Sequence, residues 1–468
     1  MTRLSRRQFF RQSAAAGIAA SFVISGTKSS GRVLGANDTV RVGVAGIRGR
    51  GGDHINEFSK IPGVQVTHLI DPDSRTFGSR VAQVKKLGGN TPKCFQDIRQ
   101  ALEDKDLDAV SVATCNHWHS LITIWACQAG KDVYVEKPCS HNVFEGRQCV
   151  EAARKYQRIV QHGTQRRSGN GWQTARDIAA GKFGRLLVAR GRSYRVRNSI
   201  GFKQPKDPPP ELDYNVWLGP APQQPYHENL VHYNWHWFWD TGNGDIGNNG
   251  VHAMDTTRWL IPNATLPQAV FSLGGRFLWN DQAQTPNLQF AVFDFGSTKM
   301  IFEVTEFKTA GGRQDRVFDG KAPCDPIPIV TPPDVKNPTA PRGPGEGTFG
   351  NFIACVRSRR SQDLDAHILE GHYSSALCHL ANISYRLGQD VSFAKTPDEL
   401  GDNEEVHKTF AWLKEMLVGI GVKLDTATYR LGRPLKFDPQ KEKFIDAPEA
   451  DKLLTREYRE PFVVPAQV

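Results

Sequence analysis

The segment that most constrains the fold of this chain is a glycine-dense turn placed directly after a short apolar run. Residues Val40–Ala45 place a valine at every second position, as a buried strand can, and Gly46, Ile47, Arg48, Gly49, Arg50, Gly51 and Gly52 follow at once. Glycine lets the backbone turn tightly between a strand and a helix. We predict that the helix begins near Asp53. This order is typical of the first βαβ unit of a parallel sheet.

A carboxylate follows the next predicted strand. Residues Val64–Ile70 read as a buried strand that ends in Asp71, about 25 residues beyond the glycine turn. Backbone amides of such a turn can approach a pyrophosphate, and an acid at this position accepts hydrogen bonds from an adenosine ribose. We therefore predict a dinucleotide site that comprises Gly46, Ile47, Arg48, Gly49, Arg50, Gly51 and Asp71.

The identity of the dinucleotide depends on opposing charges. Asp71 repels a 2′-phosphate and favours NAD, whereas Arg48, Arg50 and Arg75 could pair with that phosphate and favour NADP. Arg48 also stands at the second glycine position of G-x-G-x-x-G, so its side chain must point away from the phosphates or pair with them. We predict NAD or NADP, with NAD favoured, and a cofactor that is tightly held.

Strands and helices continue to alternate as far as about residue 165. We predict strands at 109–113, 133–135 and 159–161 and helices at 98–102, 121–129 and 144–156. This pattern predicts a doubly wound parallel sheet, a Rossmann domain, over residues 38–165. Ligands bind at the carboxyl edge of such a sheet. That edge should carry Asn116 and His119 after one strand and Glu136 and Lys137 after the next.

The second half of the chain has longer strands with fewer helices between them. We predict strands at 187–194, 269–277, 288–295 and 299–307, and helices at 172–180, 349–357, 368–386 and 404–417. This pattern predicts an α+β domain over residues 166–400 with a large, mostly antiparallel open sheet. Residues 204–225 and 323–344 are rich in proline and read as extended loops. Residues 401–468 are expected to form a C-terminal helix and tail packed on both domains.

A second group of chemically useful residues precedes the long strands. The aromatic segment 232–240 could be a core plug or a sugar-stacking wall that presents Trp237. A glycine-rich loop then leads to His252 and Asp255, which lie on one face of a predicted helix. Taken alone, His252 would more often be a core histidine that is bonded to backbone. His232 and His236 with Asp240 and Asp245 would permit a metal site, but we predict no metal because no H-E-x-x-H motif or C-x-x-C pair accompanies them.

The N-terminus reads as an export signal. Residues 5–10 are Ser-Arg-Arg-Gln-Phe-Phe, a twin-arginine pattern, and the apolar run 14–24 that follows is too short to span a bilayer. We therefore expect residues 1–37 to be a signal peptide and linker, with a periplasmic or otherwise exported protein and no stable membrane span. Six of the ten net positive charges lie in residues 1–37, which hold no acid, so the remainder carries +4. That balance argues against a nucleic-acid partner.

These motifs together resemble the Gfo/Idh/MocA oxidoreductases, named for glucose-fructose oxidoreductase and inositol dehydrogenase. The resemblance rests on the glycine turn, on Asn116-His-Trp-His, on Glu136-Lys-Pro and on Gly-x-His252-x-x-Asp, and it extends to residues 214–222 and 371–376. It implies a Rossmann domain and a C-terminal α+β domain that supports a homodimer or homotetramer.

The resemblance also implies roles for individual residues. Lys137 would contact the substrate and the nicotinamide ribose, and His252 would act as acid and base on a sugar hydroxyl. The family's aspartate four residues before this histidine is Asn248 here, so Asp245 or Asp255 could take over the orienting role. The implied catalytic residues are Lys137, His252 and Asp255. The implied substrate-binding residues are Lys137, Arg166, Trp237, Asp245, Asn248 and His252, and Asn116, His119, Glu136 and Lys137 would join the glycine turn and Asp71 around the cofactor.

Three functions fit this pattern. The first is an NAD(P)-dependent oxidoreductase that transfers hydride to or from a secondary hydroxyl of a sugar, glycoside or polyol. The second is an NAD-dependent glycosidase that acts through a transient 3-keto sugar. The third is a sugar-binding protein without catalysis on the same scaffold, which the replacements at Arg48 and Asn248 would favour.

Overall fold

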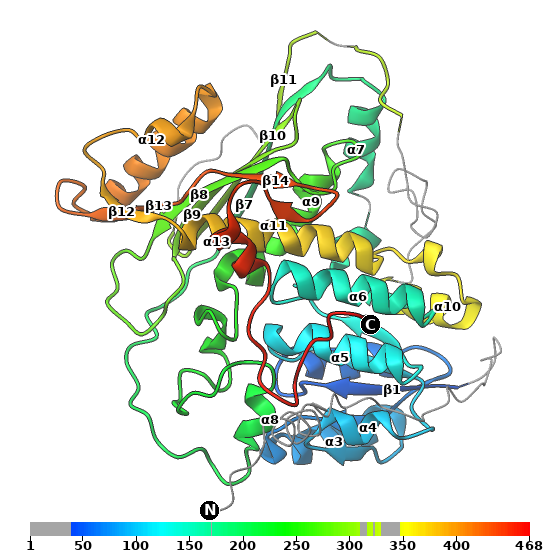
Figure 1. Cartoon of the computed structure of the whole chain (residues 1–468). Helices are drawn as coiled ribbons and strands as arrows, with labels where there is room; N and C mark the ends of the chain where they lie inside the picture. The colour runs from blue at the N-terminus through cyan, green and yellow to red at the C-terminus, as the bar shows by residue number, and fades with distance from the viewer. Residues whose placement is uncertain (1–38, 170, 309–315, 322, 329–346) are drawn as a thin grey trace, which may run out of the picture.

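The first sheet contains six parallel strands in the order β3-β2-β1-β4-β5-β6. The computed structural model describes residues 39–169, 171–308, 316–321, 323–328 and 347–468 (Figure 1), so the predicted twin-arginine segment and most of the loop 323–344 lie outside the described residues. The strands are β1 (Val40–Ala45), β2 (Val64–Ile70), β3 (Lys93–Phe95), β4 (Ala109–Val112), β5 (Asp132–Val135) and β6 (Val160–His162). The strand order reverses direction between β1 and β4, which confirms the predicted doubly wound sheet.

The helices of this domain begin earlier than the sequence pattern predicts at two places that matter for the site. Helix α2 begins at Arg50 and not near Asp53, and helix α5 begins at Asn116 and not at residue 121. Within α2, position 51 requires glycine, because the Cβ of any other residue would lie 2.2 Å from the Gly46 carbonyl oxygen. The helices are α2 (Arg50–Ser59), α3 (Phe77–Gly88), which the sequence analysis missed, α4 (Ile98–Leu102), α5 (Asn116–Gln128) and α6 (Val143–Lys155).

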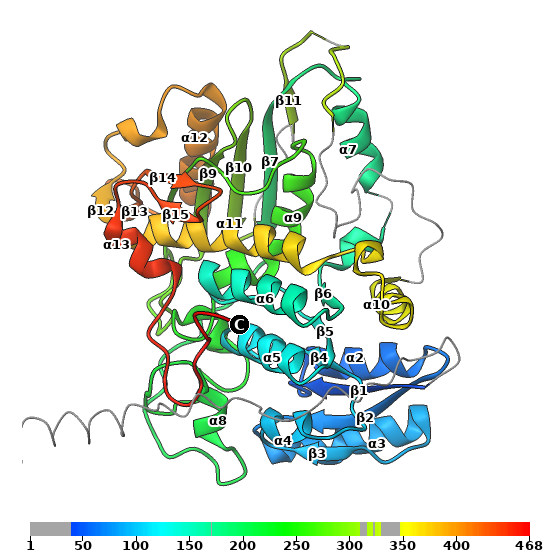
Figure 2. The same cartoon turned by 45° about the vertical axis from the view of Figure 1, so that its right-hand side comes forward.

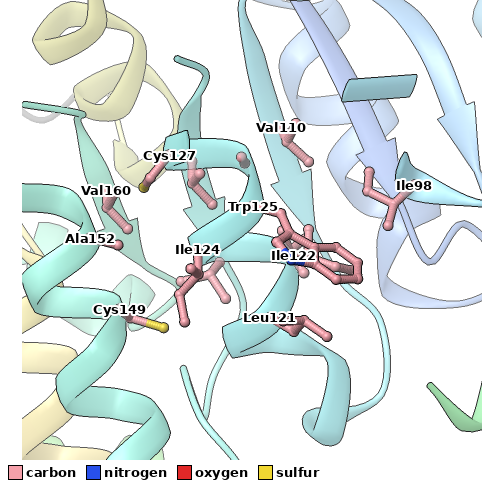
Figure 3. Close-up of a cluster of buried hydrophobic side chains, with 14 of the residues drawn as sticks. Ile98, Val110, Leu121, Ile122, Ile124, Trp125, Cys127, Cys149, Ala152 and Val160 are labelled. Atoms are coloured by element: carbon pink, nitrogen blue, oxygen red, sulfur yellow. The ribbon is translucent and has the colours of Figure 1, made fainter. Parts of the chain in front are cut away.

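A dry core fills the space between α5, α6 and the sheet (Figure 3). Trp125, Ile122 and Cys127 of α5 meet Val110 of β4 and Val160 of β6 there, and each of these side chains is buried. Every residue of α5 from Asn116 to Cys127 is buried. Such complete burial fixes the first turn of α5, and with it Asn116 and His119, against the carboxyl edge of the sheet.

The second sheet has nine strands, with a path β11-β7-β10-β9-β8-β13-β12 and with β14 paired to β8 and β15 to β14. Among the described strands of this second sheet, only the β7 and β10 pair is parallel, which confirms the predicted mostly antiparallel sheet. The strands are β7 (Leu186–Tyr194), β8 (Ala269–Gly275), β9 (Leu288–Asp294), β10 (Lys299–Thr305), β11 (Arg316–Phe318), β12 (Gln389–Ser392), β13 (Thr428–Leu431), β14 (Leu435–Asp438) and β15 (Lys443–Phe444).

Helices cover this sheet and connect it to the first domain. They are α7 (Trp172–Ala179), α8 (Tyr214–Leu218), α9 (Val251–Trp259), α10 (Gly347–Ser358), α11 (Ile368–Arg386), α12 (Glu404–Gly419) and α13 (Pro448–Asp451). Helix α11 lies between α6 and the second sheet (Figures 1 and 2) and packs on both. Helix α10 packs on the Rossmann sheet, where Phe349 stacks on Tyr134 with 4.7 Å between ring centroids. The two domains therefore share a continuous packed interface.

The C-terminal tail returns to the Rossmann domain, as Figure 2 shows for the red segment that runs down to α5. Phe462 is fully buried, and its ring lies 5.4 Å from that of Trp118 on α5. Arg459 donates a hydrogen bond to the carbonyl oxygen of Asn215 in α8 at 2.6 Å. The tail thus ties α5 to α8. Within the described part of the chain, no helix is long and apolar enough to cross a membrane.

Candidate active site

The glycine turn leaves the backbone exposed at the end of β1. Gly46 adopts φ +80°, and an added Cβ would lie 2.5 Å from the carbonyl oxygen of Ala113. Gly49 faces open space, since its Cβ would have no neighbour within 4 Å. The turn therefore presents bare backbone at the start of α2, which is the surface that a pyrophosphate needs.

Asp71 is held against this turn. Its two carboxylate oxygens accept hydrogen bonds from the backbone N–H groups of Ile47 and Asp73, both at 3.0 Å. Burial raises the pKa of Asp71 to about 6, and the two N–H donors oppose that rise. Asp71 thus fixes the shape of the turn and borders the cleft.

Arg80 of α3 also supports the turn, and the sequence analysis missed it. Its Nε donates to the carbonyl oxygen of Ile47 at 2.7 Å, and Nη2 donates to that of Arg48. Arg48 itself is exposed and borders the cleft. Arg75 is paired with Asp73, with 2.7 Å between Nε and Oδ1, so it is already engaged.

Glu136 is the centre of a buried polar network behind the cleft. Its Oε1 accepts hydrogen bonds from Arg50 Nε at 2.9 Å and Gln165 Nε2 at 3.0 Å, and it lies 3.0 Å from His54 Nε2. Burial alone raises the pKa of this carboxyl, but His54, Arg50 and Lys137 outweigh burial and hold the pKa well below its usual range. Glu136 is therefore an anionic anchor for the strand that carries Lys137.

Lys137 reaches across the cleft to the second domain. Its Nζ donates to the backbone oxygen of Asn248 at 2.8 Å and lies 3.4 Å from the Asn248 side-chain oxygen. Burial lowers the pKa of Lys137, although Glu136 and Asp245 oppose that shift. The structure thus brings together Lys137 and Asn248, which lie 111 positions apart in the chain.

The first turn of α5 adds two buried polar groups. Asn116 Nδ2 donates to Asn243 Oδ1 at 2.9 Å, which again joins the two domains. The two ring nitrogens of His119 lie 2.6 Å from the Pro138 carbonyl oxygen and 3.0 Å from that of Thr114. Both side chains border the cleft, and His119 contacts the backbone at Pro138, directly after Lys137.

His252 lies in the first turn of α9, four positions after Asn248. Burial and the charge of Lys137 lower the pKa of His252 to about 4, so the imidazole is neutral at pH 7. Arg166 also contributes a positive charge to this environment. A neutral imidazole beside a lysine cation matches what removal of an alcohol proton requires. The acid and base role of His252 stays a prediction.

Asp255 is engaged elsewhere. Its carboxylate accepts hydrogen bonds from Arg167, with 2.7 Å from Nη2 to Oδ1, and from Ser374 Oγ at 2.7 Å. Burial raises the pKa of Asp255, but Arg167 outweighs it and the pKa is lowered. Asp255 and Arg167 are buried. The structure places Asp255 in an ion pair with Arg167 and shows no hydrogen bond between Asp255 and His252.

Asp245 lies near Lys137, and neither Asp245 nor Trp237 is part of the cleft lining. Asp245 Oδ1 accepts from Arg197 at 2.8 Å and from Asn249 at 3.0 Å. Trp237 is only 3% exposed, and the guanidinium of Arg197 covers its ring at 5.2 Å from the centroid. Tyr233 is 49% exposed and borders the cleft, so it offers the aromatic surface that the sequence analysis assigned to Trp237.

One continuous cleft connects the glycine turn to Lys137. Its lining includes ten of the predicted residues: Gly46, Arg48, Gly49, Arg50, Asp71, Asn116, His119, Glu136, Lys137 and Asn248. Ile47 and Gly51 lie beneath the turn, and Arg166, Trp237, Asp245, His252 and Asp255 lie outside this lining. The bare backbone of the turn, the pinned Asp71 and the open position at Gly49 fit an extended dinucleotide. The described residues contain no cluster of three metal-binding side chains.

Comparison with protein families matches both halves of the fold. Residues 40–164 match the Gfo/Idh/MocA oxidoreductase family, NAD-binding Rossmann fold. Residues 198–272 match the C-terminal α/β domain of the same oxidoreductase family. The two matches follow each other in the order expected for one two-domain protein.

Curated relatives are similar over part of their length. A glycosyl hydrolase family 109 protein of Shewanella pealeana is 31% identical over 137 residues, which cover 28% of this chain and 30% of the relative. An inositol 2-dehydrogenase of Salmonella paratyphi B is 28% identical over 171 residues, 36% of this chain and 50% of the relative. The matches thus span half or less of these relatives.

Among solved structures, the WlbA dehydrogenase of Bordetella pertussis, in complex with NADH and UDP-GlcNAcA, has a TM-score of 0.54 at 18% identity. The alignment covers 74% of this chain and 97% of that one. At this identity the likeness concerns the fold alone. The two consecutive family matches place residues 40–164 in the NAD-binding Rossmann domain, and residues 198–272 in the C-terminal α/β domain, of the Gfo/Idh/MocA oxidoreductase family.

Proposed function

We propose that this protein transfers hydride between NAD(H) and a secondary hydroxyl of a sugar, glycoside or polyol. The observation that carries the proposal is a cleft that runs from the glycine turn to Lys137 and Asn248, with His252 outside the lining but close enough to Lys137 for that charge to act on its imidazole. Bound NAD would supply a hydride acceptor at that end. The turn residues 46–51 and Asp71 would hold the dinucleotide.

The residues of the chain would manage the proton. Oxidation of a secondary alcohol removes the hydroxyl proton as hydride leaves carbon, so the site needs a base and a cation near the oxygen. His252 is neutral at pH 7 and would accept the proton, while the Lys137 ammonium would stabilise the developing alkoxide. Asn248 holds that ammonium in place through its backbone oxygen at 2.8 Å.

Two measurements test this proposal. Denaturing the purified protein should release NAD(H), detectable by an enzymatic cycling assay, because the cofactor is expected to be tightly held. A panel of sugars and polyols should then change the absorbance at 340 nm. Absence of both bound nucleotide and any hydride transfer would overturn the proposal and would favour a sugar-binding protein without catalysis.

A redox-assisted glycosidase is a second candidate, and the matches to glycosyl hydrolase family 109 proteins favour it. In that reaction, oxidation at one sugar carbon would acidify the neighbouring C–H bond, the aglycone would be eliminated, water would add to the resulting unsaturated ketone, and return of the hydride would leave no net redox change. Free p-nitrophenol from a panel of p-nitrophenyl glycosides, with no net change in NADH, would support it. Stable NADH formation without free aglycone would support the first candidate.

We propose in addition that the twin-arginine segment exports the protein and that the open second sheet forms a homodimer or homotetramer. Replacing Arg6 and Arg7 by lysine should retain the protein in the cytoplasm in a fractionation experiment. Light scattering coupled to size-exclusion chromatography should give two or four times the monomer mass of 52.1 kDa, less the mass of any cleaved signal.

A further inference from the structure

Two exposed arginines flank the proposed reaction site without a carboxylate partner. Arg195 directly follows β7, and Arg166 lies in the 3₁₀ helix η2 (Gln165–Ser168) that follows β6. Within the described residues, the side chain of Arg166 makes no hydrogen bond or ion pair, and that of Arg195 makes one long contact, 3.5 Å to Asn249 Oδ1.

Both arginines are linked to residues of the reaction site. Asn249 adjoins Asn248, whose backbone oxygen holds Lys137 Nζ at 2.8 Å, so Arg195 lies one residue away from the lysine's partner. Arg166 lies close enough to His252 for its charge to act on the imidazole. The residue before it, Gln165, donates to Glu136 at 3.0 Å. Arg166, just after β6, and Arg195, just after β7, therefore both lie near the reaction site, outside the lining of the cleft itself.

Three ionised acids near this site are already paired with cations of their own, and burial raises the pKa of a fourth, Glu306, to about 8. Glu136 pairs with Arg50 at 2.9 Å, Asp245 with Arg197 at 2.8 Å and Asp255 with Arg167 at 2.7 Å. Lys137 adds a further positive charge. The site thus presents an excess of cations to whatever enters it.

We propose that the substrate carries an anionic substituent, a carboxylate or a sulfate ester, and that Arg166 and Arg195 bind it. This inference rests on the proposed function, because it names the class of sugar on which Lys137 and His252 act. A guanidinium presents several N–H donors in a plane and pairs with a carboxylate or sulfate through two hydrogen bonds. The charged substituent would orient the sugar ring so that one hydroxyl meets His252.

The test compares sugars in matched neutral and charged forms. Glucose, galactose and mannose, their uronic acids and their 6-sulfates are offered to the purified protein with NAD, and kcat/KM is measured at 340 nm. We expect the wild-type protein to prefer a charged form. In Arg195→Ala and Arg166→Ala, the ratio of kcat/KM for the charged over the neutral form should fall about 10- to 100-fold, as expected for a hydrogen bond to a charged group.

Two controls make the result specific. Arg185 is an exposed arginine just before β7, at the opposite end of the strand from Arg195. Arg185→Ala should therefore leave the ratio unchanged. Arg195→Lys should recover part of the preference, since it restores the charge without the planar donors. A preference for uronic acids over sulfates, or the reverse, identifies the anionic group.

The outcomes separate this inference from the proposed function. Turnover of neutral sugars, with a charge ratio near one that both arginine variants leave unchanged, would overturn the inference and leave the oxidoreductase function in place. Binding of a charged sugar that is lost in Arg195→Ala, measured by calorimetry, without any hydride transfer would support the anionic site and overturn the proposed function. Failure of every charged sugar to bind or react would overturn the inference.

Discussion

Replacing Asp255 by asparagine tests whether this residue is catalytic or structural. Asp255 and its partner Arg167 are 0% and 2% exposed in their side chains, and three contacts of 2.7 to 3.0 Å join them. Removing one member of a buried ion pair costs about 3 to 5 kcal/mol, because the other charge remains buried without compensation. Arg167 would keep its contact with Glu370 at 3.1 Å. We therefore expect the free energy of unfolding of Asp255→Asn to fall by about 3 kcal/mol, near the lower limit of this range.

Two tryptophans beside Arg167 allow the unfolding of this region to be measured. Trp172 and Trp259 stack with 3.7 Å between centroids, and the Arg167 guanidinium lies 4.8 Å from the Trp259 ring. Urea unfolding followed by tryptophan fluorescence should therefore report on this region. The Asp255→Asn variant should unfold at a clearly lower urea concentration than the wild-type protein. Before unfolding begins, the variant and the wild-type protein should release NAD at the same urea concentration.

Two further variants control the experiment. The double variant Asp255→Leu, Arg167→Met should recover much of the lost stability, because it removes both charges and retains apolar volume. Asp398→Asn removes an acid that is 91% exposed and paired with Lys395, and it should change stability by less than about 0.5 kcal/mol. An unchanged unfolding midpoint in Asp255→Asn together with abolished turnover would refute this reasoning and would return Asp255 to the catalytic group.

Three other predictions follow from the site and the tail. Lys137→Ala should keep the fold and the bound nucleotide but lose more than about 100-fold in turnover, and full activity at 340 nm would contradict the role of this lysine. Since His252 is neutral above about pH 4, kcat at saturating NAD, where protonation of Asp71 near pH 6 does not limit cofactor binding, should stay level from pH 7 to 5 and fall as pH drops through about 4 in a brief assay; a fall centred at pH 6.5 would contradict the lowered pKa. Phe462→Ala should destabilise the protein by about 3 to 5 kcal/mol, because the ring is fully buried, whereas Phe202→Ala, which alters a ring that is 60% exposed, should not change the thermal midpoint.

The fold could be predicted from local patterns because each signal lies within one strand, turn or helix. The glycine turn, Asp71 and the Lys137 strand end are of this kind, and their places in the sheet are confirmed. The start of α5 could not be predicted, because histidine, tryptophan and asparagine have low helix propensity. The burial of the whole helix determines where it begins.

Much of the candidate site depends on contacts that no local pattern encodes. Arg80 reaches Ile47 across 33 positions, His54 reaches Glu136 across 82, and Arg167 reaches Asp255 across 88. A charged residue in isolation reads as a solvated surface group until the packed partner is known. The spacing of His252 and Asp255 correctly placed both on α9, but the same spacing could not show that Arg167 would occupy the carboxylate.

The position of Phe462 has a consequence for the order in which the protein is made. The ribosome releases residues 39–164 long before residues 455–468, so the slot beside Trp118 stays empty while the rest of the chain is synthesised. The first domain to emerge is thus the last to be completed. A truncated chain that ends before the tail would leave an apolar slot open to water, and it should bind chaperones more strongly than the full-length chain in a pull-down from a translation extract.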